Sequence, residues 1–221
     1  MSSSVRSPQI DIDAFILIGG KSSRFGSDKA FAAFGPETLA ARAVRTVKVG
    51  LSPLRTALVV SRGDQFTAQT LDSISCSVVT DRQPGLGAWS GIDAAITNAQ
   101  SEWVLALACD LPFVSVGFLR LLADRMNDEF NAVVPLQPDG RLQPLCALYR
   151  VLPVQSALAT FLKNPNLLPP VSAVFEKLRT FIVVAEEYNE LANAENLFLN
   201  INTHADLTAA TELEYHQSSD T

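Results

Sequence analysis

Residues 14–29 read AFILIGGKSSRFGSDK, in which an unbroken apolar run ends at two glycines and gives way to a polar, basic stretch. A short apolar run without alternation is typical of a strand buried on both faces of a parallel sheet. Glycine lets the backbone adopt positive φ and approach a ligand closely. We therefore expect a strand over residues 14–18, followed by a ligand-facing loop over residues 19–29.

Similar apolar runs recur along the chain, and segments with helical spacing of apolar residues separate them. The apolar runs occupy residues 57–60, 78–79, 103–108 and 132–135, and the helical segments occupy residues 36–49, 64–71, 92–99 and 115–126, the last with Ser115 as its N-cap. This alternation predicts an α/β fold, a Rossmann-like three-layer sandwich in which helices cover both faces of a mostly parallel sheet.

The second half of the chain alternates less regularly. We expect a strand over 142–149, helices over 151–162 and 171–178, an edge strand over 181–185 and a terminal helix over 205–215. A chain of 221 residues has the length of one domain with a substantial core. We therefore expect a single domain over residues 12–215, with a flexible N-terminal tail at 1–11 and a C-terminal tail at 216–221.

Composition and charge limit the class of protein. Hydrophobic residues make up 48% of the chain and charged residues 18%, which indicates a folded globular protein rather than a disordered one. The net charge of −6 argues against a nucleic-acid partner, because such binding usually needs a basic face. No apolar run approaches the roughly 20 residues of a membrane-spanning helix, and the N-terminus lacks the apolar stretch of a signal peptide. We therefore expect a cytoplasmic protein with no membrane partner.

The loop after the first strand combines glycines with Lys21, Arg24 and Lys29. Exposed backbone N–H groups suit phosphate oxygens, and the basic side chains add positive charge for a polyphosphate. The loop is neither a Walker A motif nor a dinucleotide fingerprint, because GxxxxGKS/T and GxGxxG are both absent. The residues alone leave two interpretations, a phosphate-binding loop and an ordinary tight turn.

Two aspartates stand just after apolar runs, at the positions where loops of a parallel sheet form ligand sites. Asp110 comes after WVLALAC, and Asp81 comes after the short run at 78–79. Mg²⁺ prefers one or two carboxylates together with phosphate oxygens, so Asp110 is a candidate magnesium ligand, and Asp81 could face the same site. The alternatives are a helix cap for Asp110 and a turn residue for Asp81.

These features together resemble one family. The stretch LIGGKSSRFGSDKA resembles the opening signature of the molybdenum cofactor guanylyltransferases, a family of MobA-like nucleotidyltransferases, which runs Leu-x-Gly-Gly-x-Ser-x-Arg-x-Gly-x-Asp-Lys. Further landmarks follow in the family's order: Asp81, GAWSGI, CDLPFV, QPLCALYR and, near the C-terminus, NINT. The resemblance covers about residues 12–215 and implies a fold of the nucleotide-diphospho-sugar transferase type.

The resemblance implies transfer of GMP from GTP to molybdopterin-bound molybdenum cofactor, with release of pyrophosphate and with Mg²⁺ as the cofactor. It also implies contact with a molybdoenzyme or a chaperone that receives the product. The attacking phosphate oxygen is already anionic at pH 7, so positioning and electrostatic stabilisation would suffice without a side-chain base. By position, the resemblance implies three catalytic residues, Arg24, Lys29 and Asp110, with Asp110 as the metal ligand. The residues it implies for nucleotide binding are Leu17, Ile18, Gly19, Gly20, Lys29, Ser61, Asp81 and Asp110. The residues it implies on the pterin side are Arg141, Gln143, Asn200 and Asn202.

Two positions depart from the family pattern and keep other functions open. Ile18 replaces a usual Ala, and Ser61 stands where many members carry an Asn, which has more hydrogen-bonding groups. A related transferase that uses CTP or another triphosphate, with molybdopterin or another phosphorylated acceptor, is therefore an alternative. A non-catalytic adaptor is a second alternative, although Lys29 and Asp110 are both present. A dinucleotide-dependent oxidoreductase would need the missing GxGxxG fingerprint. His204 is interpreted as a surface or capping residue.

Overall fold

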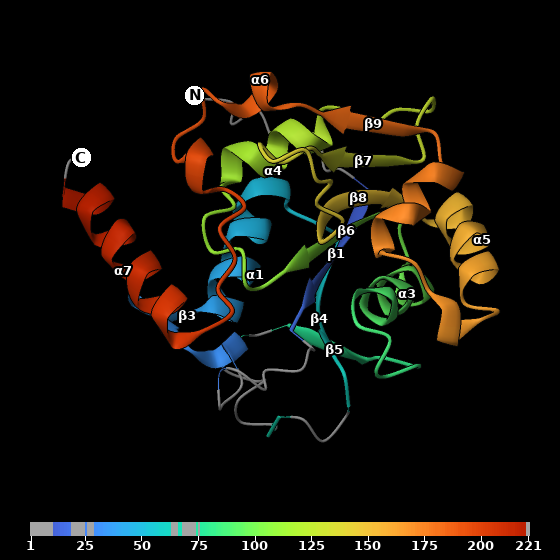
Figure 1. The fold of residues 1–221 in the computed structure, drawn as a ribbon, viewed down its shortest axis with the longest axis horizontal. Coiled ribbons are helices and arrows are strands. Elements are labelled where there is room, and N and C mark those ends of the chain that lie inside the picture. Colours follow the sequence, from blue (N-terminus) through green and yellow to red (C-terminus); the bar gives the residue numbers. More distant parts are fainter. Residues whose placement is uncertain are drawn as a thin grey trace, which may run out of the picture.

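A computed structural model describes residues 11–18, 25, 29–62, 66–67, 74 and 76–219, which form a central sheet with helices on both faces (Figure 1). Within these residues, seven strands make the sheet in the order β5-β4-β1-β6-β8-β7-β9, and only β8 runs antiparallel to its neighbours. The strands are β1 (Ile12–Leu17), β4 (Arg55–Val60), β5 (Ser77–Thr80), β6 (Trp103–Ala108), β7 (Ala132–Pro135), β8 (Cys146–Arg150) and β9 (Thr180–Val183). The predicted α/β class with a mostly parallel sheet is confirmed.

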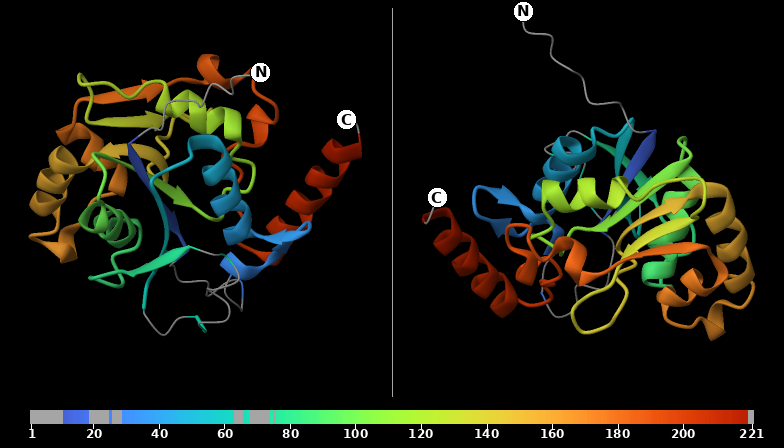
Figure 2. Two further views of the ribbon diagram at one scale, coloured as in Figure 1. Left: turned by 180° about the vertical axis from the view of Figure 1, so that it is seen from behind. Right: turned by 90° about the horizontal axis from the view of Figure 1, so that it is seen from above.

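Helices lie on the two opposite faces of this sheet (Figures 1 and 2). The α-helices of the described residues are α1 (Leu39–Leu51), α3 (Ala88–Asn98), α4 (Val116–Ala123), α5 (Val151–Phe161), α6 (Ala185–Tyr188) and α7 (His204–Ser219). Ile16 packs with α1 and α4, whereas Phe15 and Leu17 pack with α3 and α5. Because successive side chains of a strand point to opposite faces, the apolar run of β1 contributes to the core on both sides. None of these helices combines the length and the apolar character needed to cross a membrane.

Side-chain caps determine where two of the helices begin. Thr38 Oγ1 accepts from the Ala41 N–H at 3.2 Å at the start of α1, and Ser115 Oγ accepts from the Phe118 N–H at 3.2 Å at the start of α4. Such bonds satisfy N–H groups that lack a partner inside the helix. The predicted cap at Ser115 is confirmed. Since Ser115 fills this role, Asp110 does not cap the helix that follows it.

The strands predicted at residues 103–108 and 132–135 match β6 and β7, and the predicted edge strand is β9. β8 begins at Cys146 rather than at residue 142, because the Cys146 N–H turns back to Gln143 O at 3.2 Å and Pro144 has no N–H to donate to a ladder. The helix predicted at residues 64–71 lies mostly outside the described residues.

Two elements near the C-terminus differ from expectation. Residues 171–178 were predicted as an α-helix, and the structure has the 3-10 helix η3 (Val171–Lys177). Apolar side chains three residues apart suit both helix types, so the pattern marks the buried positions without deciding the hydrogen bonding. α7 continues to Ser219, beyond the boundary expected at residue 215.

The C-terminal part of the chain crosses back to the edge of the sheet where the parallel strands end. The Ile201 N–H donates to Asp110 O at 3.0 Å. Helix α7 then lies beside α1 (Figure 2), where Glu214 pairs with Arg42 at 2.8 Å. Ala210 is fully buried in a small apolar cluster that includes Phe34. The last helix is therefore attached to the same edge of the sheet as the segment after β6.

Candidate active site

The strand order creates a typical ligand-binding position at the carboxyl ends of β1 and β6. From β1 the chain forms β4 and β5 on one side, and it then returns to form β6 on the other side of β1. Leu17 and Ala108 are partners in the parallel register, so both strands end at the same level. Loops that leave such strands diverge, and open α/β sheets bind ligands between them. The segments after Leu17 and after Ala108 therefore start side by side.

Lys29 and Asp110 meet at this edge, although 81 positions separate them in the chain. The Lys29 ammonium donates to Asp110 Oδ2 at 2.5 Å, and the two side chains are only 19% and 15% exposed. Lys29 opens the short 3-10 helix η1 (Lys29–Phe31), and Asp110 follows β6 by two residues. The residues predicted to hold phosphate and metal are therefore neighbours in the structure.

The Lys29 ammonium has acceptors for all three of its N–H bonds. Besides Asp110, it donates to Ile201 O at 3.2 Å and to Asn202 Oδ1 at 3.3 Å. Because an ammonium has three donors, a phosphate oxygen must replace one of these acceptors to bind it with a full hydrogen bond. Asn202, predicted for the pterin side, thus lies within hydrogen-bonding distance of the residue predicted to hold phosphate.

The second carboxylate oxygen of Asp110 has a different environment. Asp110 Oδ1 is buried, and no donor among the described residues reaches it. Burying a carboxylate oxygen without a partner is costly, and a divalent cation would satisfy it. The described part of the chain gathers no group of three or more His, Cys, Asp or Glu side chains suited to a metal. Among the described residues, Asp110 would therefore be the one carboxylate offered to a cation here, and Mg²⁺ commonly takes further ligands from water and substrate phosphates.

The backbone at the end of β1 is already engaged within the sheet. Leu17 O accepts from the Cys109 N–H at 3.2 Å, and the Ile18 N–H donates to Val59 O at 3.1 Å. These bonds remove the Ile18 N–H from the groups that could contact a nucleotide. Ser61, the next predicted nucleotide-side residue, directly follows β4 at the same edge. The predicted contacts of these residues with a nucleotide stay predictions.

Asp81 directly follows β5 and forms a turn there. Its Oδ1 accepts from the Gln83 N–H at 2.9 Å, and its own N–H donates to Val60 O at 2.9 Å. Burial raises the pKa of the Asp81 carboxyl above its usual range. The turn role is confirmed. A contact between Asp81 and the nucleoside stays a prediction. β5, which Asp81 follows, lies three strand spacings, or about 14 Å, from β6.

The two late asparagines flank the residue that contacts the Asp110 backbone. Ile201 lies between Asn200 and Asn202, and its N–H and carbonyl reach Asp110 and Lys29 respectively. Asn200 and Asn202 are both exposed. The structure thus places the NINT segment at the Lys29–Asp110 pair.

Gln143 lies close to the end of β6, whereas Arg141 lies farther out on the same connection. The Gln143 side chain accepts from the Leu145 N–H at 3.3 Å, and Leu145 O accepts from the Ala108 N–H at 2.8 Å. Arg141 is 77% exposed and pairs with Asp139 through its guanidinium. Arg141 is therefore a surface residue of a turn that begins after β7.

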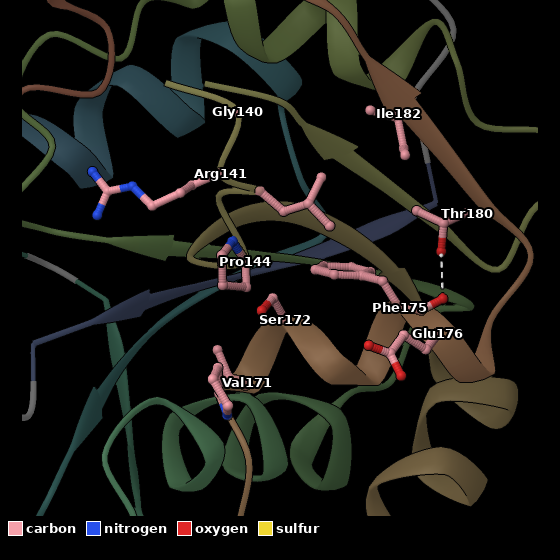
Figure 3. A pocket seen from close by; sticks show the side chains of 11 residues that line it. Gly140, Arg141, Pro144, Val171, Ser172, Phe175, Glu176, Thr180 and Ile182 are labelled. Carbon is pink, nitrogen blue, oxygen red and sulfur yellow. Dashed lines mark hydrogen bonds between the residues drawn. The ribbon is translucent and has the colours of Figure 1, made fainter. Parts of the chain in front are cut away.

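A groove of about 620 Å³ lies between this turn, η3 and β9 (Figure 3). Figure 3 shows the Arg141 side chain extending away from Thr180 and Ile182 on the opposite wall. The exposed surface of the groove is mostly apolar. The residues that line it are Gly140, Arg141, Leu142, Pro144, Pro170, Val171, Ser172, Phe175, Glu176, Thr180 and Ile182. Gln143 is not part of this lining. The sequence contains no pattern that points to this groove, because three separate segments form it.

Gly19, Gly20, Lys21 and Arg24 lie outside the described residues, and their predicted roles stay predictions. Phe25, within the same loop, is described and is only 2% exposed. Two of the loop residues with described positions, Phe25 and Lys29, are both in contact with the C-terminal segment.

Sequence reasoning missed the contact between His204 and the first loop. His204 Nε2 lies 2.9 Å from Phe25 O, and the two rings pack with centroids 4.0 Å apart. His204 is exposed, as expected, but it also joins two segments that are 179 positions apart. A signal for the local structure does exist: Thr203 and Asp206 have the spacing of a capping box at the start of α7. No local signal points to the distant partner.

Comparison with known proteins identifies the family. The family model of the MobA-like NTP transferase domain matches residues 14–178. A protein of Carboxydothermus hydrogenoformans named "Probable molybdenum cofactor guanylyltransferase" is 32% identical over 193 residues, which are 86% of this chain and 90% of that protein. A protein of the same name from Bacillus cereus is 28% identical over 88% of this chain and 93% of its own length.

Solved structures share the fold. Molybdopterin-guanine dinucleotide biosynthesis protein A from Archaeoglobus fulgidus matches with a TM-score of 0.72 at 22% identity, over 92% of this chain and 99% of that one. A 4-diphosphocytidyl-2C-methyl-D-erythritol synthase from Anaerococcus prevotii matches with a TM-score of 0.68 at 14% identity, over 92% and 96% of the two chains. Because the family model spans most of the chain and the Carboxydothermus protein matches it over most of both lengths, this chain belongs to the MobA-like NTP transferase family.

Proposed function

We propose that this nucleotidyltransferase transfers GMP from GTP to molybdopterin-bound molybdenum cofactor and releases pyrophosphate. The carrying observation is that Lys29 meets Asp110 at the carboxyl ends of β1 and β6, while Asp110 Oδ1 has no donor among the described residues. The names of the relatives from Carboxydothermus and Bacillus support the choice of substrates. The donor set at Asp110 supports Mg²⁺ as the cofactor.

The position of β6 within the sheet supports a site for two substrates. Strands β1, β4 and β5 lie on one side of it, followed at their carboxyl ends by Ser61 and Asp81. Strands β8, β7 and β9 lie on the other side, with Gln143 just before β8. A nucleotide on the first side and a phosphorylated acceptor on the second would bring their phosphates together beside Asp110.

The proposed reaction is a displacement at phosphorus. A terminal phosphate oxygen of the acceptor attacks the α-phosphorus of GTP, and a new P–O bond joins the acceptor to GMP. The bond from the α-phosphorus to the bridging oxygen breaks, and this oxygen leaves with the electron pair as part of pyrophosphate. Since the attacking oxygen is anionic at neutral pH, no side chain has to remove a proton.

The protein's contribution is then electrostatic. Lys29 would offset the negative charge of the phosphates, and Mg²⁺ bound at Asp110 would supply further positive charge. Of the three acceptors of Lys29, Asn202 is exposed and has the longest hydrogen bond, at 3.3 Å. A phosphate oxygen in place of Asn202 Oδ1 would keep the ammonium beside Asp110. The Asn202 amide would then be available to the acceptor.

Pyrophosphate release by the purified protein tests this proposal. With Mg²⁺ and molybdenum cofactor, we expect turnover with GTP, little turnover with ATP, CTP or UTP, and none after the metal is chelated. A reaction without the acceptor is the control for hydrolysis. Preference for CTP would replace the proposal with the cytidylyl alternative, which Ser61 keeps open. Absence of pyrophosphate with every triphosphate would contradict transfer and favour an adaptor.

A further inference from the structure

Asp206, in the first turn of α7, makes one hydrogen bond more than the start of a helix requires. Thr203 Oγ1 accepts from the Asp206 N–H at 3.1 Å, and Asp206 Oδ2 accepts from the Thr203 N–H at 2.8 Å, which is the reciprocal pair of a capping box. The same Oδ2 also accepts from the Asn202 N–H at 2.8 Å. Because Asn202 precedes the capping residue, this third bond holds the chain ahead of the helix rather than the helix itself.

A single peptide group connects Asp206 with Lys29. The carbonyl of this group belongs to Ile201 and accepts from the Lys29 ammonium at 3.2 Å, and its N–H is the Asn202 N–H bound by Asp206. Ile201 is fully buried, and its own N–H donates to Asp110 O at 3.0 Å. Both polar ends of the peptide plane are therefore held, and this plane sets the direction in which the Asn202 side chain leaves the backbone.

The Asn202 side chain returns to the same ammonium. The Lys29 ammonium donates to Asn202 Oδ1 at 3.3 Å. Since an ammonium only donates, the amide must turn its oxygen toward Lys29, which leaves its NH2 group for other partners. Asn202 is exposed, so a substrate can reach this group. The described contacts thus run without a gap from Asp206 through Asn202 to the Lys29–Asp110 pair.

The charge of Asp206 strengthens its hold on Asn202. The bond from the Asn202 N–H is the main cause that keeps the pKa of the Asp206 carboxyl below its usual range, and the positive charge of Lys29 acts in the same direction. The carboxyl is therefore ionised at neutral pH. A hydrogen bond from an N–H to a carboxylate is stronger than one to a neutral oxygen.

We propose that Asp206 is a positioning residue for the acceptor substrate, acting through the Asn202 amide. By fixing the Asn202 backbone, it keeps the amide beside Lys29 with the NH2 group ready for a phosphate oxygen of the acceptor, so that less conformational entropy is lost on binding. This inference rests on the proposed function, because it places the acceptor at Asn202. Lys29 keeps its bonds to Asp110 and Ile201 without Asp206, so binding of GTP should change little.

Four variants separate positioning from helix capping. Asp206→Ala removes both bonds of the carboxylate, and Asp206→Asn keeps an acceptor oxygen without the charge. Thr203→Ala removes the other half of the capping box and leaves the bond to Asn202 in place. Glu212→Ala controls for net charge, because Glu212 is an exposed acid of the same helix.

The expected result is a change in KM for one substrate. Loss of a hydrogen bond to a carboxylate corresponds to about a tenfold change in an equilibrium constant. We expect Asp206→Ala to raise KM for molybdenum cofactor about tenfold and Asp206→Asn to raise it less, with KM for GTP near that of the parent protein. Thr203→Ala and Glu212→Ala should match the parent in both values. An equal rise in Thr203→Ala and Asp206→Ala would reduce Asp206 to a helix cap and overturn the inference.

Combination with Asn202→Ala tests the route of the effect. If Asp206 acts through the Asn202 amide, the double variant should have the same KM for molybdenum cofactor as Asn202→Ala alone. A rise equal to the product of the two single effects would show that Asp206 acts elsewhere, and it would overturn the inference.

Nuclear magnetic resonance with inorganic phosphate distinguishes failure of this inference from failure of the proposed function. The side-chain NH2 signals of Asn202, identified by their loss in Asn202→Ala, report on phosphate without acceptor or turnover. If the parent protein releases no pyrophosphate but its Asn202 signals respond to about tenfold less phosphate than those of Asp206→Ala, the proposed function fails and the positioning role stands. Equal phosphate affinities in the two proteins, or no response in the parent, would overturn the positioning role whatever the activity.

Discussion

The two oxygens of the Asp110 carboxylate have different partners. Oδ2 accepts from the Lys29 ammonium, whereas Oδ1 is buried with no donor among the described residues. A single carboxylate can therefore contact the Lys29 side chain through one oxygen and a divalent cation through the other. In this respect Asp110 differs from Asp81, whose Oδ1 accepts a hydrogen bond from the Gln83 N–H of its own turn.

Replacement of Asp110 by Asn should remove metal-dependent turnover and leave the fold intact. The amide keeps the shape of the carboxylate but lacks its charge, and removal of one such electrostatic group typically lowers kcat by about 10²–10³-fold. Pyrophosphate release and Mn²⁺ binding followed by electron paramagnetic resonance are the measurements. Asp124→Asn, at an exposed aspartate after α4, is the control. Near-normal turnover of Asp110→Asn would show that its assignment as metal ligand is wrong.

Replacement of Lys29 by Met should weaken GTP binding. Met has a similar length without the ammonium, and a charge-assisted hydrogen bond contributes on the order of 1.5–3 kcal/mol, so the affinity should fall by at least about tenfold. Calorimetry with GTP and Mg²⁺ measures the effect, and Lys177→Met, at an exposed lysine of η3, controls for net charge. An affinity equal to that of the control would count against a phosphate contact by Lys29.

At the level of secondary-structure elements, α3 packs very closely on the end of β1. A Cβ at Gly91 would lie 3.1 Å from Leu17 Cδ1, whereas a Cβ at Gly50 of α1 would lie 3.5 Å from Leu119 Cβ. The first distance requires the Leu17 side chain to move, and the second is an ordinary contact. Leu17 is the last residue of β1, so this close packing lies directly below the candidate active site.

The two glycines should therefore respond differently to alanine. Gly50→Ala should stabilise the protein by up to about 1 kcal/mol, because alanine favours the helix and restricts the unfolded chain. Gly91→Ala should lack this gain, because the displaced Leu17 side chain offsets it. Urea unfolding of both variants measures the difference in free energy of unfolding. An equal gain for the two variants would contradict the close packing of α3 on β1.

Elements defined by local pattern are predictable from the sequence, and contacts between distant segments are not. The runs that form β6 and β7 are apolar throughout and end at polar residues or proline, so their limits can be identified. The meeting of Lys29 with Asp110 is also foreseeable, since both follow strands that end at one edge. The contact of His204 with Phe25 is not foreseeable, because no local pattern relates residues 179 positions apart. The 3-10 form of η3 is not foreseeable either, because its apolar spacing suits two helix types.

At the scale of the whole molecule, β8 carries two ionisable groups in the middle of the core. Cys146 and Tyr149 are both fully buried. Burial raises the pKa of the Cys146 thiol to about 12, and it raises the pKa of the Tyr149 hydroxyl well above its usual value. Both groups therefore favour the folded state only while they keep their protons. The stability of the sheet should therefore decrease at alkaline pH.

The free energy of unfolding should fall as the pH rises above about 8.5. There the unfolded chain releases the Cys146 proton while the folded state retains it until pH about 12. This single group should contribute a slope of about −1.4 kcal/mol per pH unit in that window. Denaturant unfolding between pH 8 and 10.5 measures how the free energy of unfolding changes with pH. In Cys146→Ala, this slope should lose the contribution of the Cys146 proton, about −1.4 kcal/mol per pH unit. The packing cost of that variant is read at pH 7. An unchanged slope would contradict the raised pKa.

The attachment of residues 201–206 to Lys29, Asp110 and Phe25 has a consequence for biosynthesis. Ile201 follows Lys29 by 172 positions, so these residues are synthesised long after the pair whose surroundings they complete. A nascent chain can build its sheet once β9 has been synthesised, but it cannot complete the Lys29–Asp110 site until residues 201–206 have followed. Proteolytic removal of residues 201–206 and of α7 would remove their contacts with Lys29 and Asp110, so we expect it to abolish turnover of GTP.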